Sequence, residues 1–145
     1  MIKQHIKVGT DIAIFVHNHG VLNVLLIQRK NEPYQGSWCL PGGFLEDDED
    51  IEAGARRELK EETGLSVEVL HQLRAFGAPD RDPRQRTITI AHYAVLVGDP
   101  PAVEGGDDAA DARWYEVTNL PQLGFDHPQI IAAAIERVLA ELHSV

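Results

Sequence analysis

Residues 43–65 read GFLEDDEDIEAGARRELKEETGL, and the rest of the chain is organised around this stretch. The acidic residues near its start favour a helix N-terminus, with Asp47 or Asp48 as the N-cap. Gly64 favours a helix stop, because glycine adopts the left-handed conformation that a C-cap needs. The stretch therefore predicts a helix of about four turns over residues 50–63.

Three carboxylates lie near the end of this predicted helix. Its apolar stripe consists of Ile51, Ala55 and Leu59. Glu58 and Glu62 continue that stripe, and Glu61 lies on its flank. Burying an unpaired charge is costly, a like-charged i, i+4 pair is unfavourable, and a helix C-terminus is already negative. A bound cation would relieve all three penalties, and oxygen ligands favour Mg²⁺ or Mn²⁺. The alternative is a solvated helix end that pairs with Arg57 and Lys60.

The spacing along this stretch resembles the complete Nudix box. Gly43 is followed by five residues and Glu49, then by seven residues and the run RELKEETGL at 57–65. Nine positions are specified, and each would match by chance about one time in ten on ordinary residue usage, which makes coincidence negligible. The resemblance implies a pyrophosphohydrolase that cleaves a nucleoside diphosphate linked to another group, with a divalent metal as cofactor.

The resemblance also implies roles for individual residues of the box. In the Nudix family, the glutamates that match Glu58, Glu61 and Glu62 hold the metal, together with the backbone carbonyl of the residue that matches Gly42. The residues that match Arg57 and Glu49 pair with each other and orient the helix. We therefore predict that the three glutamates and Arg57 are catalytic, and that the glutamates and Gly42 bind Mg²⁺ or Mn²⁺.

The composition indicates one globular domain that spans residues 1–145. Apolar residues make up 43% of the chain and charged residues 25%, which is typical of soluble domains. A single cysteine, Cys39, excludes an internal disulfide. The sequence has no signal peptide and no apolar run of membrane-spanning length, so we expect a cytoplasmic protein without a membrane partner. The net charge of −10 argues against a nucleic-acid partner, which would need a basic face.

The hydrophobic pattern outside the box predicts strands and a second helix. The strands are expected at 6–16, 21–29, 65–76, 86–98 and 113–117, with a short one before the box. The second helix begins at Asp126-His127-Pro128-Gln129, which resembles a capping box, and runs to about residue 143 with Leu142 facing inward. These elements predict an α/β/α sandwich around a mixed β-sheet, which agrees with the Nudix fold that the resemblance implies.

An arginine-rich loop follows the predicted strand over 65–76. Residues 77–86 contain Arg81, Arg84 and Arg86 in an otherwise acidic protein. Arginine forks suit phosphate oxygens, because they donate two hydrogen bonds at once. We predict that these arginines bind the substrate. The alternative is a solvated loop whose arginines pair with the aspartates of the same loop.

The run from Phe76 to Arg86 resembles the ADP-ribose pyrophosphatase branch of the family. Pro79 lies fourteen residues after Leu65, and in that branch a proline at about this distance accompanies ADP-ribose recognition. We also predict that Arg29, late in a strand, reaches the phosphates, with a strand-end surface charge as the alternative. The resemblance implies a small-molecule nucleotide substrate, ADP-ribose, which is hydrolysed to AMP and ribose 5-phosphate.

Two other functions stay open at this point. The chain could hydrolyse nucleoside triphosphates or dinucleotides, as housecleaning relatives do. It could also bind ADP-ribose without turnover, as Nudix sensors do, usually while fused to a DNA-binding domain. The chain ends at Val145, soon after its last predicted helix, and the box retains every acid, so we expect an enzyme.

An acidic loop at 104–111 supplies further carboxylates. In larger relatives a carboxylate in the corresponding loop acts as general base or as an extra metal ligand, and we favour Asp107 or Asp108 for that role. One of the three box glutamates is an alternative base, and a solvated acidic loop is the other interpretation. None of the seven histidines has the spacing of a metal motif, so His127 is interpreted as part of the helix start.

Two apolar features predict a homodimer, which is common in the ADP-ribose branch. Ile2 and Ile6 alternate with polar residues in an N-terminal segment with no assigned partner. Ile130 and Ala134 widen the apolar face of the last helix beyond what one sheet layer requires. The alternative is that both segments close the core of a single chain.

Overall fold

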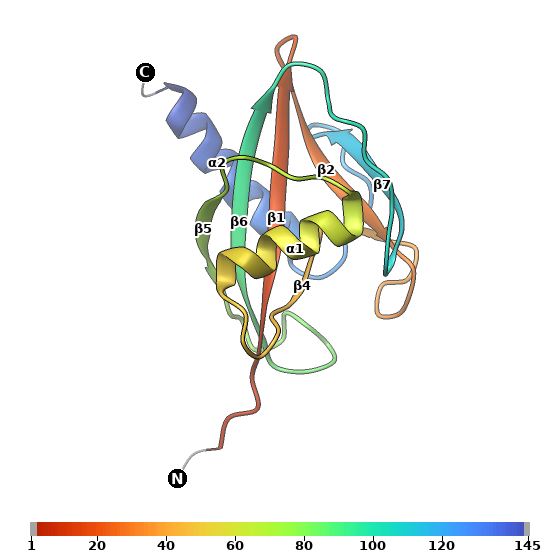
Figure 1. The fold of residues 1–145 in the computed structure, drawn as a ribbon, viewed down its shortest axis with the longest axis vertical. Helices are drawn as coiled ribbons and strands as arrows, with labels where there is room; N and C mark the ends of the chain where they lie inside the picture. Colours follow the sequence, from red (N-terminus) through yellow and green to blue (C-terminus); the bar gives the residue numbers. More distant parts are fainter. Residues whose placement is uncertain (1–2, 144–145) are drawn as a thin grey trace.

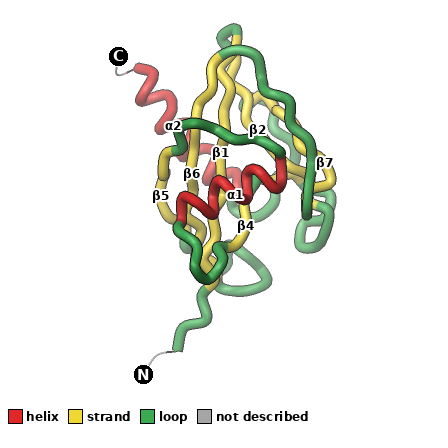
Figure 2. The backbone as a smooth tube through the Cα atoms, viewed as in Figure 1, coloured by secondary structure: helices red, strands yellow, loops and turns green. Residues whose placement is uncertain are grey.

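A computed structural model describes residues 3–143, which form a seven-stranded mixed sheet between two helices (Figure 1). The elements are β1 (Lys7–Asn18), β2 (Val21–Arg29), β3 (Trp38–Cys39), β4 (Gly42–Phe44), α1 (Ile51–Thr63), β5 (His71–Phe76), β6 (Thr87–Val97), β7 (Ala109–Glu116) and α2 (His127–His143). Helix α1 covers one face of the sheet and α2 the other, as Figure 2 also shows. The predicted α/β/α sandwich is confirmed.

Strand β1 is the centre of the sheet. The main strand order is β3-β2-β1-β6-β5, while β4 also pairs with β1 and β7 with β2. Strands β1 and β6 are parallel, and the other pairs are antiparallel. Because β1 has a helix on each side, its sequence is apolar on both faces. Ile12 and Ile14 face the cluster under α1, whereas Ala13 and Phe15 face the cluster under α2.

Helix α1 ends where the sequence predicts but begins later. Its N-cap is Asp50, whose side chain accepts from the Glu52 N–H, so the prediction of Asp47 or Asp48 is wrong. At the other end Gly64 has φ 76°, and its N–H donates to Lys60, as a left-handed C-cap does. Asp50 combines an extended backbone with a side chain that reaches the first turn, which is what an N-cap requires.

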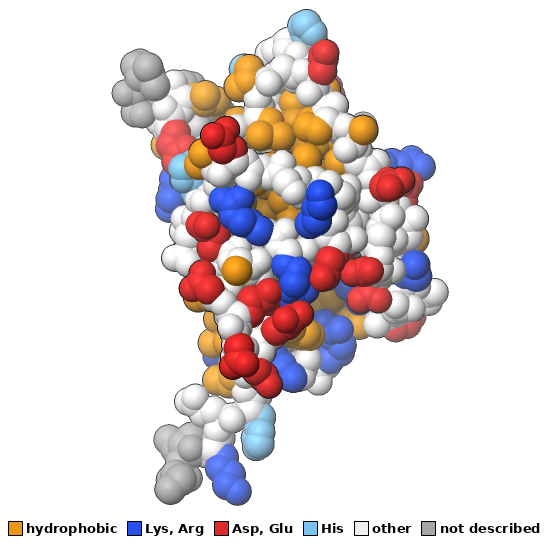
Figure 3. Space-filling model, in the orientation of Figure 1, with side chains coloured by type: hydrophobic (Ala, Val, Ile, Leu, Met, Phe, Trp, Pro, Cys, Tyr) orange, Lys and Arg blue, Asp and Glu red, His pale blue; other side chains and the backbone are white. Residues whose placement is uncertain are grey.

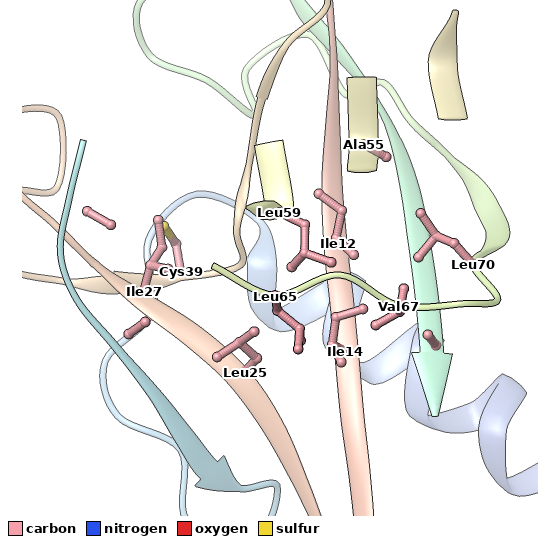
Figure 4. Packing of buried hydrophobic residues seen from close by; sticks show 13 residues of the cluster. Ile12, Ile14, Leu25, Ile27, Cys39, Ala55, Leu59, Leu65, Val67 and Leu70 are labelled. Carbon is pink, nitrogen blue, oxygen red and sulfur yellow. The ribbon is translucent and has the colours of Figure 1, made fainter. Parts of the chain in front are cut away.

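The segment after α1 differs from the predicted strand over 65–76. Only His71–Phe76 pairs, as edge strand β5. Before it, Leu65, Val67 and Leu70 are buried without forming a strand, and they pack against Ile12, Leu59 and their neighbours (Figure 4). The alternation of apolar and polar residues shows that one side of this segment is buried. An irregular segment that crosses the sheet buries one side just as a strand does, so the pattern alone does not distinguish the two.

Strand β7 is longer than the predicted strand over 113–117. It begins at Ala109, inside the predicted acidic loop, and pairs with β2 as far as Arg29. The sequence there is rich in aspartate and alanine, which are poor strand formers. Pairing with an already ordered neighbour overrides that local preference.

Helix α2 buries a wide face within this one chain. Ile130 and Ala134 are fully buried in the cluster under α2, together with Ile131 and Val138. They therefore close the monomer's own core and give no support to a dimer. Leu142, predicted to face inward, is 48% exposed, because the end of the helix extends past the sheet (Figure 1).

The dimer argument from the N-terminus is not settled by the fold. Ile2 lies outside the described residues, and Ile6 is half-buried. The homodimer stays a prediction. No helix in residues 3–143 is both long enough and apolar enough to cross a membrane.

Candidate active site

A cavity of about 550 Å³ brings together residues from the box, the acidic loop and the arginine-rich loop. Its acidic lining residues are Asp11, Glu32, Glu58, Glu61, Glu62, Asp107 and Asp108, and its arginines are Arg29, Arg81 and Arg84. Gly42 and Gly43 of β4 lie beside the acids. Figure 3 shows acidic side chains gathered around α1 and the loop before it, with basic side chains among them. The cavity therefore combines both charge signs that a metal–diphosphate complex would contact.

Arg57 donates hydrogen bonds to three glutamates of the box, Glu49, Glu58 and Glu61. It donates two hydrogen bonds to the Glu49 carboxylate, at 2.6 and 2.8 Å. Its Nη1 donates to Glu58 at 2.9 Å and to Glu61 at 3.1 Å. These hydrogen bonds from Arg57 lower the pKa of Glu49 to about 2. The predicted pair between Arg57 and Glu49 is present, and the same guanidinium orients two further box glutamates.

Glu62 is in a different environment from the other box glutamates. It is 5% exposed, and its Oε1 accepts a 2.8 Å hydrogen bond from the Gly42 N–H. Burial raises its pKa to about 8, with further upward contributions from Glu58, Asp11 and Asp108, although the Gly42 hydrogen bond opposes the shift. A carboxylate buried among other carboxylates is a site of unbalanced negative charge.

The carboxylate and backbone oxygens of the cavity are the type of ligand that a hard divalent cation prefers. This donor set consists of carboxylates that together raise the pKa of Glu62, next to the backbone of two glycines. A Cβ on Gly43 would lie 2.6 Å from the Glu58 carboxylate carbon, so only glycine allows this approach. Within residues 3–143, no three His, Cys, Asp or Glu side chains are already close enough to hold an ion. Arg57 and Gly42 each hold some of these carboxylates, so a complete shell requires side chains to turn toward one another.

The acidic loop is packed against the end of α1. The Glu104 N–H donates to the Thr63 carbonyl at 3.2 Å, and Gly106 lies so close to Glu61 that a Cβ there would be 2.5 Å from its carbonyl oxygen. This packing brings Asp107 and Asp108 to the cavity. Asp108 is near enough to Glu62 to raise its pKa. The assignment of a general base among these acids stays a prediction.

Arg29 and Arg84 share an aromatic neighbour at the cavity. The Arg29 guanidinium lies 5.1 Å from the centre of the Phe125 ring, and that of Arg84 lies 5.8 Å from it. Arg84 also donates to Asp82 at 3.0 and 2.8 Å. The alternative interpretation of loop 77–86, in which its arginines pair with its own aspartates, is therefore correct in part, because Arg84 pairs with Asp82. Arg84 nevertheless remains half-exposed and lines the cavity.

Arg81 is part of the protein interior. It is 8% exposed and donates to Asp126 at 2.9 and 2.7 Å and to Asp11 at 3.4 Å. The Asp126 carboxylate thus binds Arg81 instead of serving the predicted capping box. Arg81 lines the cavity, but its guanidinium already donates hydrogen bonds to two carboxylates. Its role in substrate binding stays a prediction. The described residues that line the cavity include neither Pro79 nor Arg86.

Sequence reasoning missed two buried ionisable residues that line the cavity, Asp11 and His127. Asp11 is 9% exposed and His127 is 4% exposed. A signal for Asp11 was available, because a carboxylate inside the apolar run of β1 has to be paired. No such signal marks His127, since a residue at a helix start is ordinarily exposed.

The metal-free protein is expected to lose stability as pH rises toward 8. The folded pKa of Glu62, about 8, lies above its ordinary value of 4.5, so between these values the folded state binds more protons than the unfolded state. This contribution is fully present below 4.5 and lost as pH rises through 8. Its size is on the order of a few kcal/mol.

Urea unfolding with chelator at about pH 6 and about pH 9 measures this effect. Glu62→Gln is the control, because its side chain does not titrate, and its free energy of unfolding is expected to fall less over the same interval. An equal fall in both proteins would contradict the shifted pKa of Glu62.

Comparison with known proteins agrees with the geometry of the site. A model of the NUDIX domain matches residues 6–134. The chain is 45% identical over 108 residues to an ADP-ribose pyrophosphatase of Methanocaldococcus jannaschii, and the match covers 74% of this chain and 63% of that protein. It is 35% identical over 132 residues to the ADPR responsive transcriptional repressor NtrR of Acinetobacter baylyi, covering 88% and 52%. The chain thus spans less than two thirds of the length of either relative.

Solved structures extend the comparison to bound ligands. The NUDIX domain of Shewanella oneidensis NrtR complexed with ADP ribose has a TM-score of 0.86 and 31% identity, covering 94% of this chain and 90% of that one. A bifunctional NMN adenylyltransferase/ADP ribose pyrophosphatase of Francisella tularensis, complexed with AMP and a manganese ion, has a TM-score of 0.80 and 32% identity, covering 90% and 41%.

Proposed function

The chain belongs to the Nudix family, and from this premise we propose that it is a pyrophosphohydrolase that cleaves ADP-ribose into AMP and ribose 5-phosphate. One observation carries the proposal. A single cavity joins the box glutamates and the acidic loop to the two arginines around Phe125. Similarity to an ADP-ribose pyrophosphatase and to a domain complexed with ADP ribose supports this choice of substrate.

We propose that Glu58, Glu61 and Glu62, with the Gly42 carbonyl, hold Mg²⁺ or Mn²⁺. The similar structure with bound manganese supports a divalent ion. When bound, such an ion lowers the pKa of a coordinated water and offsets charge on the leaving phosphate. Arg57, which donates to Glu58 and Glu61, orients their carboxylates.

The remaining cavity residues handle the proton and the diphosphate. A carboxylate of the box, or Asp107 or Asp108, takes the proton of the attacking water. Arg29 and Arg84 donate hydrogen bonds to the diphosphate oxygens and offset their charge. This local positive charge is needed, because the chain has a net charge of −10 and its substrate is an anion.

The test is the identification of products after incubation with ADP-ribose and Mg²⁺ or Mn²⁺. AMP and ribose 5-phosphate in equal amounts are expected. A panel of nucleoside triphosphates and dinucleotides serves as the comparison, and faster hydrolysis of any of these would favour a housecleaning role over the proposed one.

The similarity to NrtR favours a second candidate, in which the domain binds ADP-ribose without turnover. Calorimetry with ADP-ribose and Mg²⁺, followed by product analysis of the same sample, separates the two. Heat of binding without release of AMP would establish the sensor and reject the hydrolase.

Arg84→Ala is expected to raise KM for ADP-ribose by about tenfold or more and to change kcat less. The reason is that charge-assisted hydrogen bonds to the diphosphate contribute to binding throughout the reaction. Steady-state kinetics of AMP release measures both constants.

Arg113→Ala is the matched control for this change. Arg113 also donates to an aspartate two residues before it, at 2.7 Å, and lies 5.7 Å from an aromatic ring, that of Trp38. It is not among the described residues that line the cavity. Equal KM values for the two variants would show that Arg84 does not contact the substrate.

A further inference from the structure

A row of buried polar side chains connects the arginine-rich loop to the backbone beside the candidate metal site. Arg81 donates to Asp11 on β1 at 3.4 Å. The other oxygen of Asp11 lies 3.3 Å from Nε2 of His127, at the start of α2. On the far side of the ring, Nδ1 of His127 accepts a 2.9 Å hydrogen bond from the Leu40 N–H. All of these contacts join residues that are far apart in sequence.

Leu40 lies at the crossover between two strand pairings, where its N–H donates to His127 and not to a neighbouring strand. The chain leaves β3, which pairs with β2, and enters β4, which pairs with β1, by way of Leu40 and Pro41. Leu40 is 1% exposed, so its N–H would be buried without a partner if His127 were absent. Proline has no N–H and cannot add a donor here. His127 is therefore the side chain that satisfies the backbone of this crossover.

The crossover leads directly into the candidate metal site. The Pro41 carbonyl accepts from the Ile12 N–H at 2.9 Å, and the Gly42 N–H donates to Glu62 at 2.8 Å. The position of the Gly42 backbone thus depends on the two residues before it. A small shift at Leu40 would move the Gly42 carbonyl relative to the Glu62 carboxylate.

We propose that His127 is a positioning residue, which holds the Leu40–Gly42 segment so that the Gly42 carbonyl and Glu62 face the same bound cation. The inference rests on the proposed metal site. It assigns to a buried histidine a role that its place at a helix start does not suggest. His127 does not itself contact the cation in this arrangement.

The hydrogen bonds define the form of the imidazole ring. Burial lowers the pKa of His127, and the Asp11 carboxylate and then Cys39 raise it, with a net upward shift. The Leu40 N–H opposes that shift, because Nδ1 accepts a hydrogen bond only while it carries a lone pair. The contact with Leu40 therefore favours the neutral ring, with its proton on Nε2 directed at Asp11.

The experiment measures Mn²⁺ affinity without nucleotide, from the loss of the free-ion electron paramagnetic resonance signal. His127→Leu removes the acceptor and is expected to weaken Mn²⁺ binding by about 10–100-fold. His127→Asn keeps an acceptor for Leu40 and is expected to retain most of the affinity. Tyr93→Phe is the control, since it removes another side-chain hydrogen bond to α2, that to Glu141.

Wild-type Mn²⁺ affinity in His127→Leu would overturn the inference, as would an equal loss in Tyr93→Phe. In case His127→Leu does not fold, the wild-type protein gives a second readout. Nitrogen NMR is expected to show an unprotonated Nδ1 with scalar coupling to the Leu40 amide, and a protonated Nδ1 would also overturn the inference. A protein that binds Mn²⁺ as described but releases no AMP from ADP-ribose would reject the proposed activity and leave the role of His127 standing.

Discussion

Glu62→Gln is expected to lower kcat for ADP-ribose hydrolysis by roughly 10²–10⁴-fold while the fold stays intact. Glu62 is the most buried of the box glutamates, and three other carboxylates raise its pKa. The amide has nearly the same shape and can still accept from the Gly42 N–H, but it carries no negative charge and is a poorer ligand for a hard cation. AMP release at saturating substrate measures the loss, and circular dichroism checks the fold.

Glu52→Gln is the matched control for this prediction. Glu52 lies on the same helix, and it is exposed and paired only with Arg56 among the ion pairs of the described residues. Its substitution is expected to leave kcat unchanged, because exposed i, i+4 pairs contribute little. Near-normal turnover of Glu62→Gln would remove Glu62 from the catalytic site.

Gly42→Ala is expected to destabilise the protein by about 3 kcal/mol or more, which lowers Tm by roughly 10 °C. A Cβ at Gly42 would lie 2.1 Å from the carbonyl oxygen of Thr10 and 2.9 Å from the Cα of Asp11. Both atoms belong to the backbone of β1, which is fixed between β4 and β6. The clash therefore cannot be relieved by a side-chain rotation, and the β1–β4 pairing has to open.

Thermal unfolding followed by circular dichroism measures this change. Gly77→Ala is the control, because the nearest atom to its added Cβ, Ile88 Cγ1, is at an ordinary contact distance of 3.6 Å. A Tm of Gly42→Ala within a few degrees of that control would show that β4 can shift away from β1 at little cost.

The two predictions concern the two ends of one hydrogen bond. Glu62 accepts from Gly42, so the charge at the site and the approach of β4 to α1 depend on each other. The glycine at this position allows the backbone to lie against β1, and the buried carboxylate then occupies the space beside it.

Local sequence signals determined the elements around the box. Helix α1 and its Gly64 cap follow from apolar periodicity and from the conformational freedom of glycine. Strand β2 is correct at both ends, because turn residues bound it; His19 and Gly20 have φ of 52° and 75°, as a two-residue hairpin turn requires. The box glutamates are also local, since residues three and four apart share a helix face.

The tertiary structure alone decided the partners of the charged side chains. The sequence predicts that Arg81 binds substrate, but only the structure shows that its Nε and Nη2 donate to Asp126, which is 45 residues away. His127 satisfies Leu40 from 87 residues away, and β7 forms where β2 offers a pairing edge. The spacing of residues in the sequence indicates which of them share a face of one helix or strand. It does not indicate which helices and strands contact each other in the folded protein. A buried charge pairs with whichever opposite group the packed core brings within about 3 Å, and that choice exists only once the sheet and its helices have assembled.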